Sequence, residues 1–203
     1  MAVANGHTDS GAAPHTEIVE APPEIDFRNL IWMAIVFAAM IGAILAHDRW
    51  LLNFFHVMTG VLWTGIDLFM GFVIGPIMRR MDPASRRALI VRLAPRMLFL
   101  MPTLSISAGT AGWFLAEQMG YFEVAPPALY WVIAAVVILV VLTVQGLGFL
   151  LPTNIRVYLE LRKERPDAAR IMRLMRIYIY VVASQGVLQV AMIVIMARFV
   201  TGL

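Results

Sequence analysis

Apolar residues are gathered into five long runs along the chain, separated by short polar segments. The runs cover residues 29–46, 51–78, 97–118, 129–151 and 177–200. A helix needs about 20 predominantly apolar residues to cross the hydrocarbon of a bilayer, and the first run is the shortest of the five. We therefore predict an all-α, polytopic membrane protein with five transmembrane helices, in which spans two to five form a four-helix bundle and the first span is peripheral.

Composition agrees with this prediction and narrows the class of protein. Of the 203 residues, 61% are hydrophobic and 14% are charged, and the mean hydropathy is +0.79. A soluble domain of this size is much less apolar. The chain has no cysteine, which excludes disulfides, thiolate metal sites and iron–sulfur clusters. Soluble-enzyme classes find no support, because the sequence has no phosphate-binding Gly loop, nucleophile elbow or zinc-type His pair.

The first 28 residues differ in character from the rest of the chain. They are rich in Pro, Ala and Gly and hold five acidic residues before Arg28. Such a segment cannot bury enough apolar surface to fold, so we expect residues 1–28 to be an acidic, disordered tail ahead of the transmembrane domain at 29–203. His7 and His15 lie in this tail, where two lone imidazoles are more often inert than metal-binding.

Basic residues are concentrated in two of the loops. Residues 79–96 and 152–176 hold thirteen of the sixteen Lys and Arg residues. With five spans, both loops lie on the same side as the N-terminus, and the positive-inside rule makes that side cytoplasmic. We expect a multi-pass protein of a bacterial inner (cytoplasmic) membrane, with a cytoplasmic N-terminus and a periplasmic C-terminus. The net charge of +3 then reflects topology and attraction to anionic lipid headgroups rather than binding of nucleic acid.

The two basic loops also resemble each other. Each has a Pro at the membrane exit, a basic stretch, an Asp beside a Pro, and then Arg residues interleaved with Leu, Ile and Met. Asp82 followed by Pro83 is typical of an N-cap and the first position of a helix. The pattern predicts short amphipathic helices at the interface or continuations of the spans beyond it. The halves 50–118 and 129–200 thus resemble a tandem helical hairpin.

The second span carries polar and titratable residues along one face. Spacings of four, three, four and four residues place one stripe on a helix, made up of His56, Gly60, Trp63, Asp67 and Gly71. Titratable groups within a span almost always point away from lipid, and glycines let another helix or a flat cofactor approach closely. We therefore expect the stripe to face the bundle interior, with Asp67 about 16 Å deeper than His56.

Asp67 is expected near the midplane of the membrane, where a carboxylate is either protonated or has a partner. No Lys or Arg lies deep within any span, so neutral polar groups are the more available partners. Hydrogen bonding between helices accounts for the presence of most of these polar side chains within the spans, without a catalytic role. They are Thr64, Ser105, Ser107, Thr110, Gln145, Ser184, Gln185 and Gln189.

His56 allows two interpretations. It is either a structural imidazole bonded to a neighbouring helix or an axial ligand to haem b, for which neutral imidazole is a common iron ligand. In the second case Gly60 would make room for the porphyrin face and Trp63 would pack against its edge. No other span contains a histidine. The candidates for a second ligand are His47, Met97, Met101 and a residue of another subunit.

The stretch LLNFFHVMTGVLWTGIDLFMGFVIGPIMRRM, followed by a basic loop and RLAPRMLFLMPTLSISAGTAGWFLA, resembles a hairpin of known membrane families. These are the CopD-like copper-resistance proteins, the HemJ-type protoporphyrinogen oxidases and the transmembrane domain of membrane-bound urate oxidases. The resemblance to the HemJ-type family implies haem b ligation by His56, and that to the CopD-like family implies periplasmic copper handling. The chain departs from the HemJ-type pattern because it lacks the second His and the Lys, and has Gly75, Pro76 and Arg79 instead.

Three functions remain open. The first is a haem b-binding membrane subunit in electron transfer, with His56 as ligand and Asp67 as a proton-coupled group. The second is a CopD-like copper transport or resistance protein, in which His47, His56 and Met side chains coordinate copper. The third is a structural anchor of a larger complex. The expected partners are the lipid bilayer and either redox partner subunits or a homo-oligomer, and whether the chain is an enzyme stays open.

Overall fold

The protein is an all-α membrane protein. The computed structural model describes residues 27–163 and 165–202, and these contain helices and turns but no strand. The predicted tail, with His7 and His15, lies outside the described residues up to residue 26. The elements are α1 (Asn29–Leu45), α2 (Arg49–Phe69), η1 (Met70–Ile74), α3 (Gly75–Arg80), α4 (Pro83–Gln118), η2 (Tyr121–Glu123), α5 (Ala128–Thr143), η3 (Val144–Leu150), α6 (Leu151–Leu161) and α7 (Ala168–Val200).

Four helical stretches are long and apolar enough to cross a membrane. They are Arg49–Arg80, Pro83–Gln118, Ala128–Leu161 and Ala168–Val200. The first predicted span, 29–46, corresponds to α1, which has 17 residues and is shorter than the others. The prediction of a polytopic, all-α membrane protein is confirmed. The two basic loops prove to be largely helical, because α4 and α7 each begin well before the predicted spans at 97 and 177.

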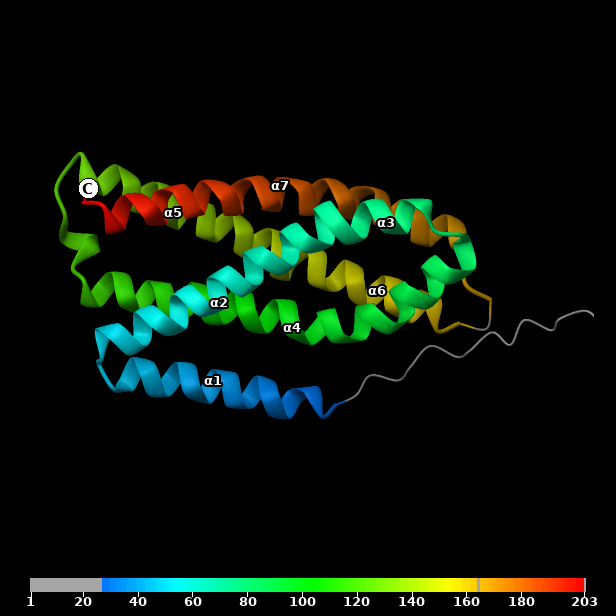
Figure 1. Cartoon of the computed structure of the whole chain (residues 1–203), viewed down its shortest axis with the longest axis horizontal. Coiled ribbons are helices and arrows are strands. Elements are labelled where there is room, and N and C mark those ends of the chain that lie inside the picture. The colour runs from blue at the N-terminus through cyan, green and yellow to red at the C-terminus, as the bar shows by residue number, and fades with distance from the viewer. Residues whose placement is uncertain (1–26, 164, 203) are drawn as a thin grey trace, which may run out of the picture.

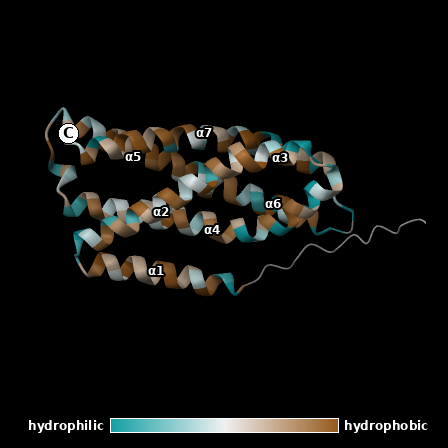
Figure 2. Cartoon of the chain, in the orientation of Figure 1, coloured by the Kyte–Doolittle hydropathy of each residue, from teal (hydrophilic) through white to brown (hydrophobic). Residues whose placement is uncertain are grey.

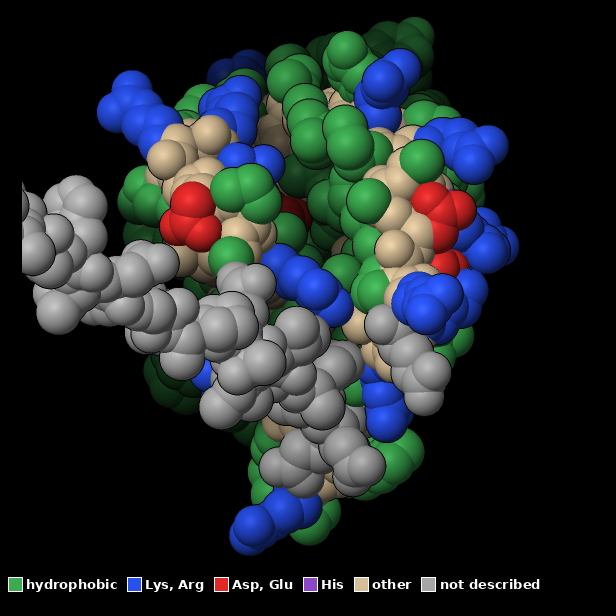
Figure 3. Space-filling view, turned by 90° about the vertical axis from the view of Figure 1, so that its right-hand side faces the viewer, with side chains coloured by type: hydrophobic (Ala, Val, Ile, Leu, Met, Phe, Trp, Pro, Cys, Tyr) green, Lys and Arg blue, Asp and Glu red, His purple; other side chains and the backbone are tan. Residues whose placement is uncertain are grey.

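The chain runs back and forth along the long axis of the molecule (Figure 1). One end holds the α3–α4 turn and the loop from α6 to α7, and is called the basic end below. The α1–α2 turn, η2 and the C-terminus lie at the opposite end. Hydrophobic residues cover much of the middle of the helices, and many hydrophilic residues lie toward their ends (Figure 2). Viewed end-on, the basic end displays Lys and Arg side chains around its rim (Figure 3).

Three helices begin at an aspartate that caps the first turn. The Asp82 carboxylate accepts hydrogen bonds from the backbone N–H groups of Ala84 (3.1 Å) and Ser85 (2.9 Å), as the Asp82–Pro83 pair predicts. Asp48 caps α2 in the same way, and Asp167 caps α7 through the backbone N–H of Arg170 at 3.0 Å. An N-cap carboxylate satisfies amide donors that have no partner inside the helix. These caps fix where the chain turns back into the membrane.

Two long helices contain a π-helical turn shortly before a proline. η1 precedes Pro76 in the stretch Arg49–Arg80, and η3 precedes Pro152 in Ala128–Leu161. A proline cannot donate to the carbonyl four residues earlier and its ring clashes with that carbonyl, so a wider turn lets the helix continue. Gly71 falls in η1 and is exposed. The inward stripe predicted on the second span therefore ends at Asp67 and does not extend to Gly71.

The most extensive contact between two helices is that of α2 with α4, and small side chains lie between them. Ser107, Ala108 and Ala111 of α4 are buried, which lets the two backbones approach closely. α1 packs against this pair, where Ala43 meets Leu52 and the α4 residues. Among the described helices, α1 makes its extensive contacts with α4 and α2 only. The predicted peripheral position of the first span is therefore correct.

Candidate functional site

A cavity of about 810 Å³ lies between α2, α4, α5 and α7, toward the end of the molecule that holds the C-terminus. Its wall is built mainly from aliphatic and aromatic side chains of all four helices, together with Tyr121 and Phe122 of η2. Among the described residues that line it, Arg49 is the one charged side chain and there is no carboxylate. The stacked rings of Tyr121 and Phe199, with centroids 5.0 Å apart, join η2 to the last turns of α7 beside it.

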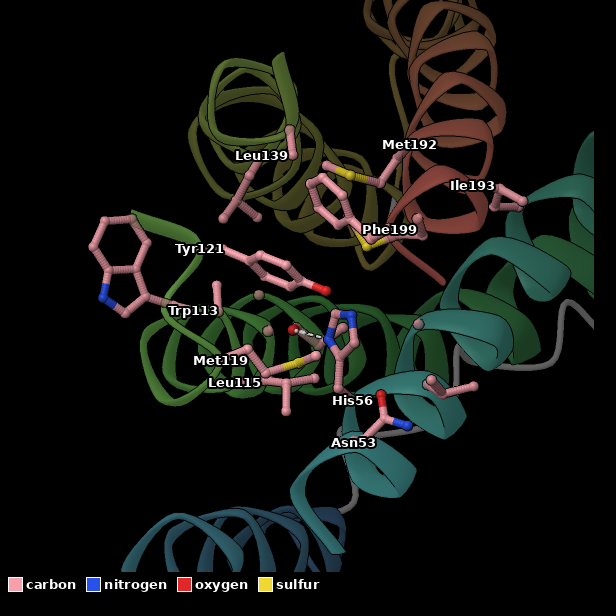
Figure 4. Close-up of a pocket in the computed structure, with 18 of the residues that line it drawn as sticks. Asn53, His56, Trp113, Leu115, Met119, Tyr121, Leu139, Met192, Ile193 and Phe199 are labelled. Atoms are coloured by element: carbon pink, nitrogen blue, oxygen red, sulfur yellow. Dashed lines mark hydrogen bonds between the residues drawn. The ribbon is translucent and has the colours of Figure 1, made fainter. Parts of the chain in front are cut away.

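His56 projects from α2 into this cavity (Figure 4). Its Nδ1 donates a hydrogen bond to the backbone carbonyl oxygen of Ala108 on α4, with a distance of 2.9 Å. A neutral imidazole carries a proton on one nitrogen only, so this bond leaves Nε2 with a free lone pair. The same arrangement orients histidines that bind metals, because the bond to the carbonyl fixes both the tautomer and the ring.

Gly112 is the residue that makes this contact possible. A Cβ atom at position 112 would lie 2.6 Å from Cε1 and 2.8 Å from Nδ1 of His56. In an α-helix a side chain covers the turn that precedes it, so a residue four positions after Ala108 would shield the Ala108 carbonyl. Glycine at 112 exposes that oxygen to the imidazole. Sequence reasoning missed Ala108 and Gly112, although the run of small residues SISAGTAG was a signal for a close approach.

Gly60 and Trp63 both line the cavity, as the stripe on the second span predicts. No atom outside the local helix lies within 4 Å of the position that a Cβ of Gly60 would take. Trp63 is buried and packs with Leu104, Ala108 and Leu142 at the inner part of the wall. Gly60 therefore leaves space beside His56, and Trp63 closes the inner part of the cavity.

Asp67 lies deeper in the bundle and is not part of the cavity wall. The side-chain amide of Gln189 on α7 donates a hydrogen bond to Asp67 Oδ2 at 2.8 Å. Gln189 belongs to the predicted set of neutral partners, and it also lines the cavity. In the described chain, no Lys or Arg forms an ion pair with Asp67. Gln189 thus connects the cavity to the buried carboxylate.

The structure brings none of the three predicted second ligands of this chain, His47, Met97 and Met101, to the cavity. His47 lies in the α1–α2 turn with φ of 53°, and its Nδ1 bonds the Leu45 carbonyl oxygen at 2.8 Å. Met101 packs against the cluster around Trp63, about two helical turns from Ala108 toward the basic end. Other methionines, which the sequence did not single out, line the cavity instead: Met119, Met192 and Met196.

The described residues contain no group of three or more His, Asp or Glu side chains that could hold a metal ion. The donors around the cavity are instead one imidazole and several thioethers. Figure 4 shows Met192 and Phe199 across the cavity from His56, and Met119 beside it. This set suits a soft metal ion or the iron of a macrocycle more than a hard cation.

No protein-family model, no curated protein and no solved structure matches the chain. The resemblance to the CopD-like and HemJ-type families stays a prediction.

Proposed function

We propose that the chain is a membrane-embedded haem b-binding protein that takes part in electron transfer, with His56 as an axial ligand. Haem b supplies a one-electron ferric/ferrous couple when it is bound. The proposal includes the orientation expected from the sequence, with the basic end in the cytoplasm of a bacterial cell. The cavity then opens toward the periplasmic face, where redox partner subunits or a second copy of the chain would exchange electrons with it.

The observation that carries the proposal is the hydrogen bonding and orientation of the His56 ring. Its Nδ1–H is engaged by the Ala108 carbonyl at 2.9 Å, and its ring faces the cavity. A purely structural imidazole needs a partner and a filled environment, whereas this ring has a partner on one side and open space on the other. The absence of a side chain at Gly112 serves this placement directly.

The rest of the cavity fits the same group. Its volume of about 810 Å³ falls in the usual range of about 300–1,000 Å³ for cofactor sites. His56 would ligate the iron through Nε2, and Arg49 would pair with the propionates. A thioether of Met192, Met196 or Met119 would hold the iron together with His56, since His/Met ligation is a known haem coordination. The resemblance of residues 51–116 to the HemJ-type family also supports the proposal.

The optical spectrum of the purified protein tests this function. We expect a b-type signal in the reduced-minus-oxidised difference spectrum, and its loss in His56→Ala. His47→Ala is the matched control, because it removes a histidine that lies outside the cavity, and it should keep the full signal. A wild-type protein without the signal, or an undiminished signal in His56→Ala, would reject His56 as a haem ligand.

The second candidate is copper handling, and the cavity methionines favour it. Met119, Met192 and Met196 line the same cavity as His56, and thioether with imidazole is a ligand set that suits copper(I). Metal analysis of protein purified after growth with copper separates the two functions. Bound copper without a haem spectrum, removed by Met192→Leu together with Met196→Leu, would favour this candidate. Neither signal would leave the role of a structural anchor.

A further inference from the structure

A second hollow, of about 400 Å³, lies on the surface of the bundle between α4 and the segment that runs from α5 into η3. Ile106, Trp113 and Phe114 of α4 line it and are 36–47% exposed. Among the described helices, α4 and α5 have no extensive contact that would close it. Both helices belong to stretches that are long and apolar enough to cross a membrane. This hollow, called the lateral recess below, therefore opens to the lipid.

The lateral recess and the cavity that holds His56 share a wall. The residues that line both are Trp63, Gly109, Trp113, Leu139 and Leu142. A Cβ atom at Gly109 would lie 3.2 Å from Leu139 Cδ1, so α4 and α5 come close at this point. Leu139 and Trp113 lie on the side of the cavity away from α2 (Figure 4). A molecule in the recess is thus separated from the proposed haem site by these shared side chains alone.

Three hydroxyl groups interrupt the mainly apolar wall of the lateral recess. The Ser105 hydroxyl donates to the Pro102 carbonyl oxygen at 3.2 Å. The Thr143 hydroxyl donates to the Leu139 carbonyl oxygen at 2.8 Å. Both hydroxyls keep lone pairs that can accept a further hydrogen bond. The Thr110 hydroxyl has no hydrogen-bond partner among the described residues. Because a polar group without a partner is unfavourable in hydrocarbon, the recess suits a ligand with polar oxygens.

These hydroxyls lie well inside the membrane. Ser105 and Thr110 precede Gln118, the last residue of α4, by thirteen and eight residues, or about 20 and 12 Å along the helix. The hydrocarbon layer is about 30 Å thick, so phospholipid headgroups stay away from this depth. A ligand here must dissolve in the membrane and carry its own oxygens. Trp63 and Trp113 in the wall favour a flat ring, since aromatic side chains pack well on rings.

We infer that the lateral recess binds a membrane-dissolved quinol and its quinone product, and that the quinol is the electron donor to the haem. The ring oxygens bond the hydroxyls of Ser105, Thr110 and Thr143, and the hydrocarbon tail extends between α4 and α5 into the lipid. This inference rests on the proposed haem function. Oxidation of one quinol to the quinone releases two electrons and two protons. The electrons reduce ferric to ferrous iron in two successive turnovers, each passing on to the redox partner, and the protons go to water at the mouth of the cavity.

The first arm of the test measures binding and does not depend on haem. Decylubiquinone is titrated into the full chain in lipid nanodiscs, and the quenching of tryptophan fluorescence is followed. Gly146→Leu places a side chain in the recess, where no atom lies within 4 Å of the added Cβ, and should weaken binding at least tenfold. Gly71→Leu is the matched control and should bind as wild type. It also lies in a π-helical turn with open space around its Cβ, but lines neither hollow.

A second variant separates hydrogen bonding from simple occupation by hydrocarbon. Thr110→Val keeps the shape of the side chain and removes the hydroxyl, so we expect about two- to tenfold weaker binding of decylubiquinone. Decylbenzene, which has the same tail but no ring oxygens, should fail to displace the quinone. Equal binding in wild type, Gly146→Leu and Thr110→Val, or full displacement by decylbenzene, would overturn the inference and leave the recess to lipid acyl chains.

The second arm follows reduction of the haem by decylubiquinol without oxygen. We expect reduction to be at least tenfold slower in Gly146→Leu than in Gly71→Leu, whereas dithionite should reduce both at the same rate. Equal rates with the quinol would overturn the inference. If no haem is present, the proposed function fails. The recess then stands as a quinone site only if Gly146→Leu and Thr110→Val weaken binding in the first arm, and is overturned otherwise.

Discussion

The two halves of the molecule share a build but differ in chemistry. The stretch Arg49–Arg80 leads into α4, and the stretch Ala128–Leu161 leads into α7. Both stretches contain a π-helical turn before a proline, and both of the helices that follow start at an aspartate cap. The first half supplies His56 and Asp67 and the contact with Ala108. α5, in the second half, supplies an apolar wall made from residues such as Val136 and Leu139.

This difference shows that a shared helical scaffold can separate two tasks. The first half positions the two titratable groups, His56 and Asp67, because α2 and α4 pack closely through small residues. The second half shapes the cavity, and its α7 contributes polar and thioether groups through Gln189 and Met192. The halves therefore respond differently to substitution, and three changes test that expectation.

The largest effect is expected in the first half at Gly112. Gly112→Ala places a Cβ 2.6 Å from the His56 ring, so the imidazole must leave the Ala108 carbonyl. We expect loss of most of the bound cofactor, by at least about tenfold, since misplaced ligands lose about 10- to 100-fold in affinity. Haem content per protein measures this. Gly65→Ala is the control, because no atom lies within 4 Å of that added Cβ; equal losses in both would contradict the role given to Gly112.

A smaller effect is expected in the second half at Val136. Val136→Trp fills part of the cavity from α5 and leaves the bond between His56 and Ala108 in place. We expect a several-fold weaker affinity for haem in a titration of the apoprotein. Val137→Trp is the neighbouring control, because Val137 is 55% exposed on the outer surface of the helix. Equal affinity for haem in the two variants would show that α5 does not form a wall of the haem site.

The smallest effect is expected on thermal stability, from removing the aspartate caps of α4 and α7. Hydrogen bonds from the Ser85 side chain and backbone lower the pKa of Asp82. Its contribution to stability is therefore complete above the usual Asp value of about 3.9 and is lost as pH falls through the lower folded value. We expect Asp82→Ala to lower the thermal midpoint slightly at neutral pH, with a difference that shrinks in acid. Asp167→Ala should lower the thermal midpoint less than Asp82→Ala, because Asp167 caps through one backbone N–H. A larger decrease in Asp167→Ala would contradict this order.

Much of the fold could be predicted because it depends on residues that are close together in the sequence. Long apolar runs give helices, Asp82–Pro83 gives a helix start, and the spacing from His56 to Asp67 gives one face of a helix. Gln189 could be placed among the partners of Asp67, since buried carboxylates need a polar neighbour. The π-helical turns escaped prediction, because a proline alone does not tell whether a helix kinks, widens or ends.

The remaining parts of the site depend on contacts between distant segments. The acceptor for His56 is a backbone carbonyl 52 residues away, and no side chain at Ala108 announces it. The role of Gly112 follows only from the crossing of α2 and α4. Met192 and Met196 resembled other core methionines until α7 was placed beside α2.

The length of α4 has a consequence for how the protein sits in a bilayer. Its 36 residues extend about 54 Å, whereas the hydrocarbon layer is about 30 Å thick. The surplus lies at the basic end, where guanidinium groups such as that of Arg87 resist entry into lipid. The arginines at the basic end therefore set the depth at which the protein sits in the bilayer. Changes in bilayer thickness are then felt at the opposite surface, so the depth of His56 below that surface follows the local lipid composition.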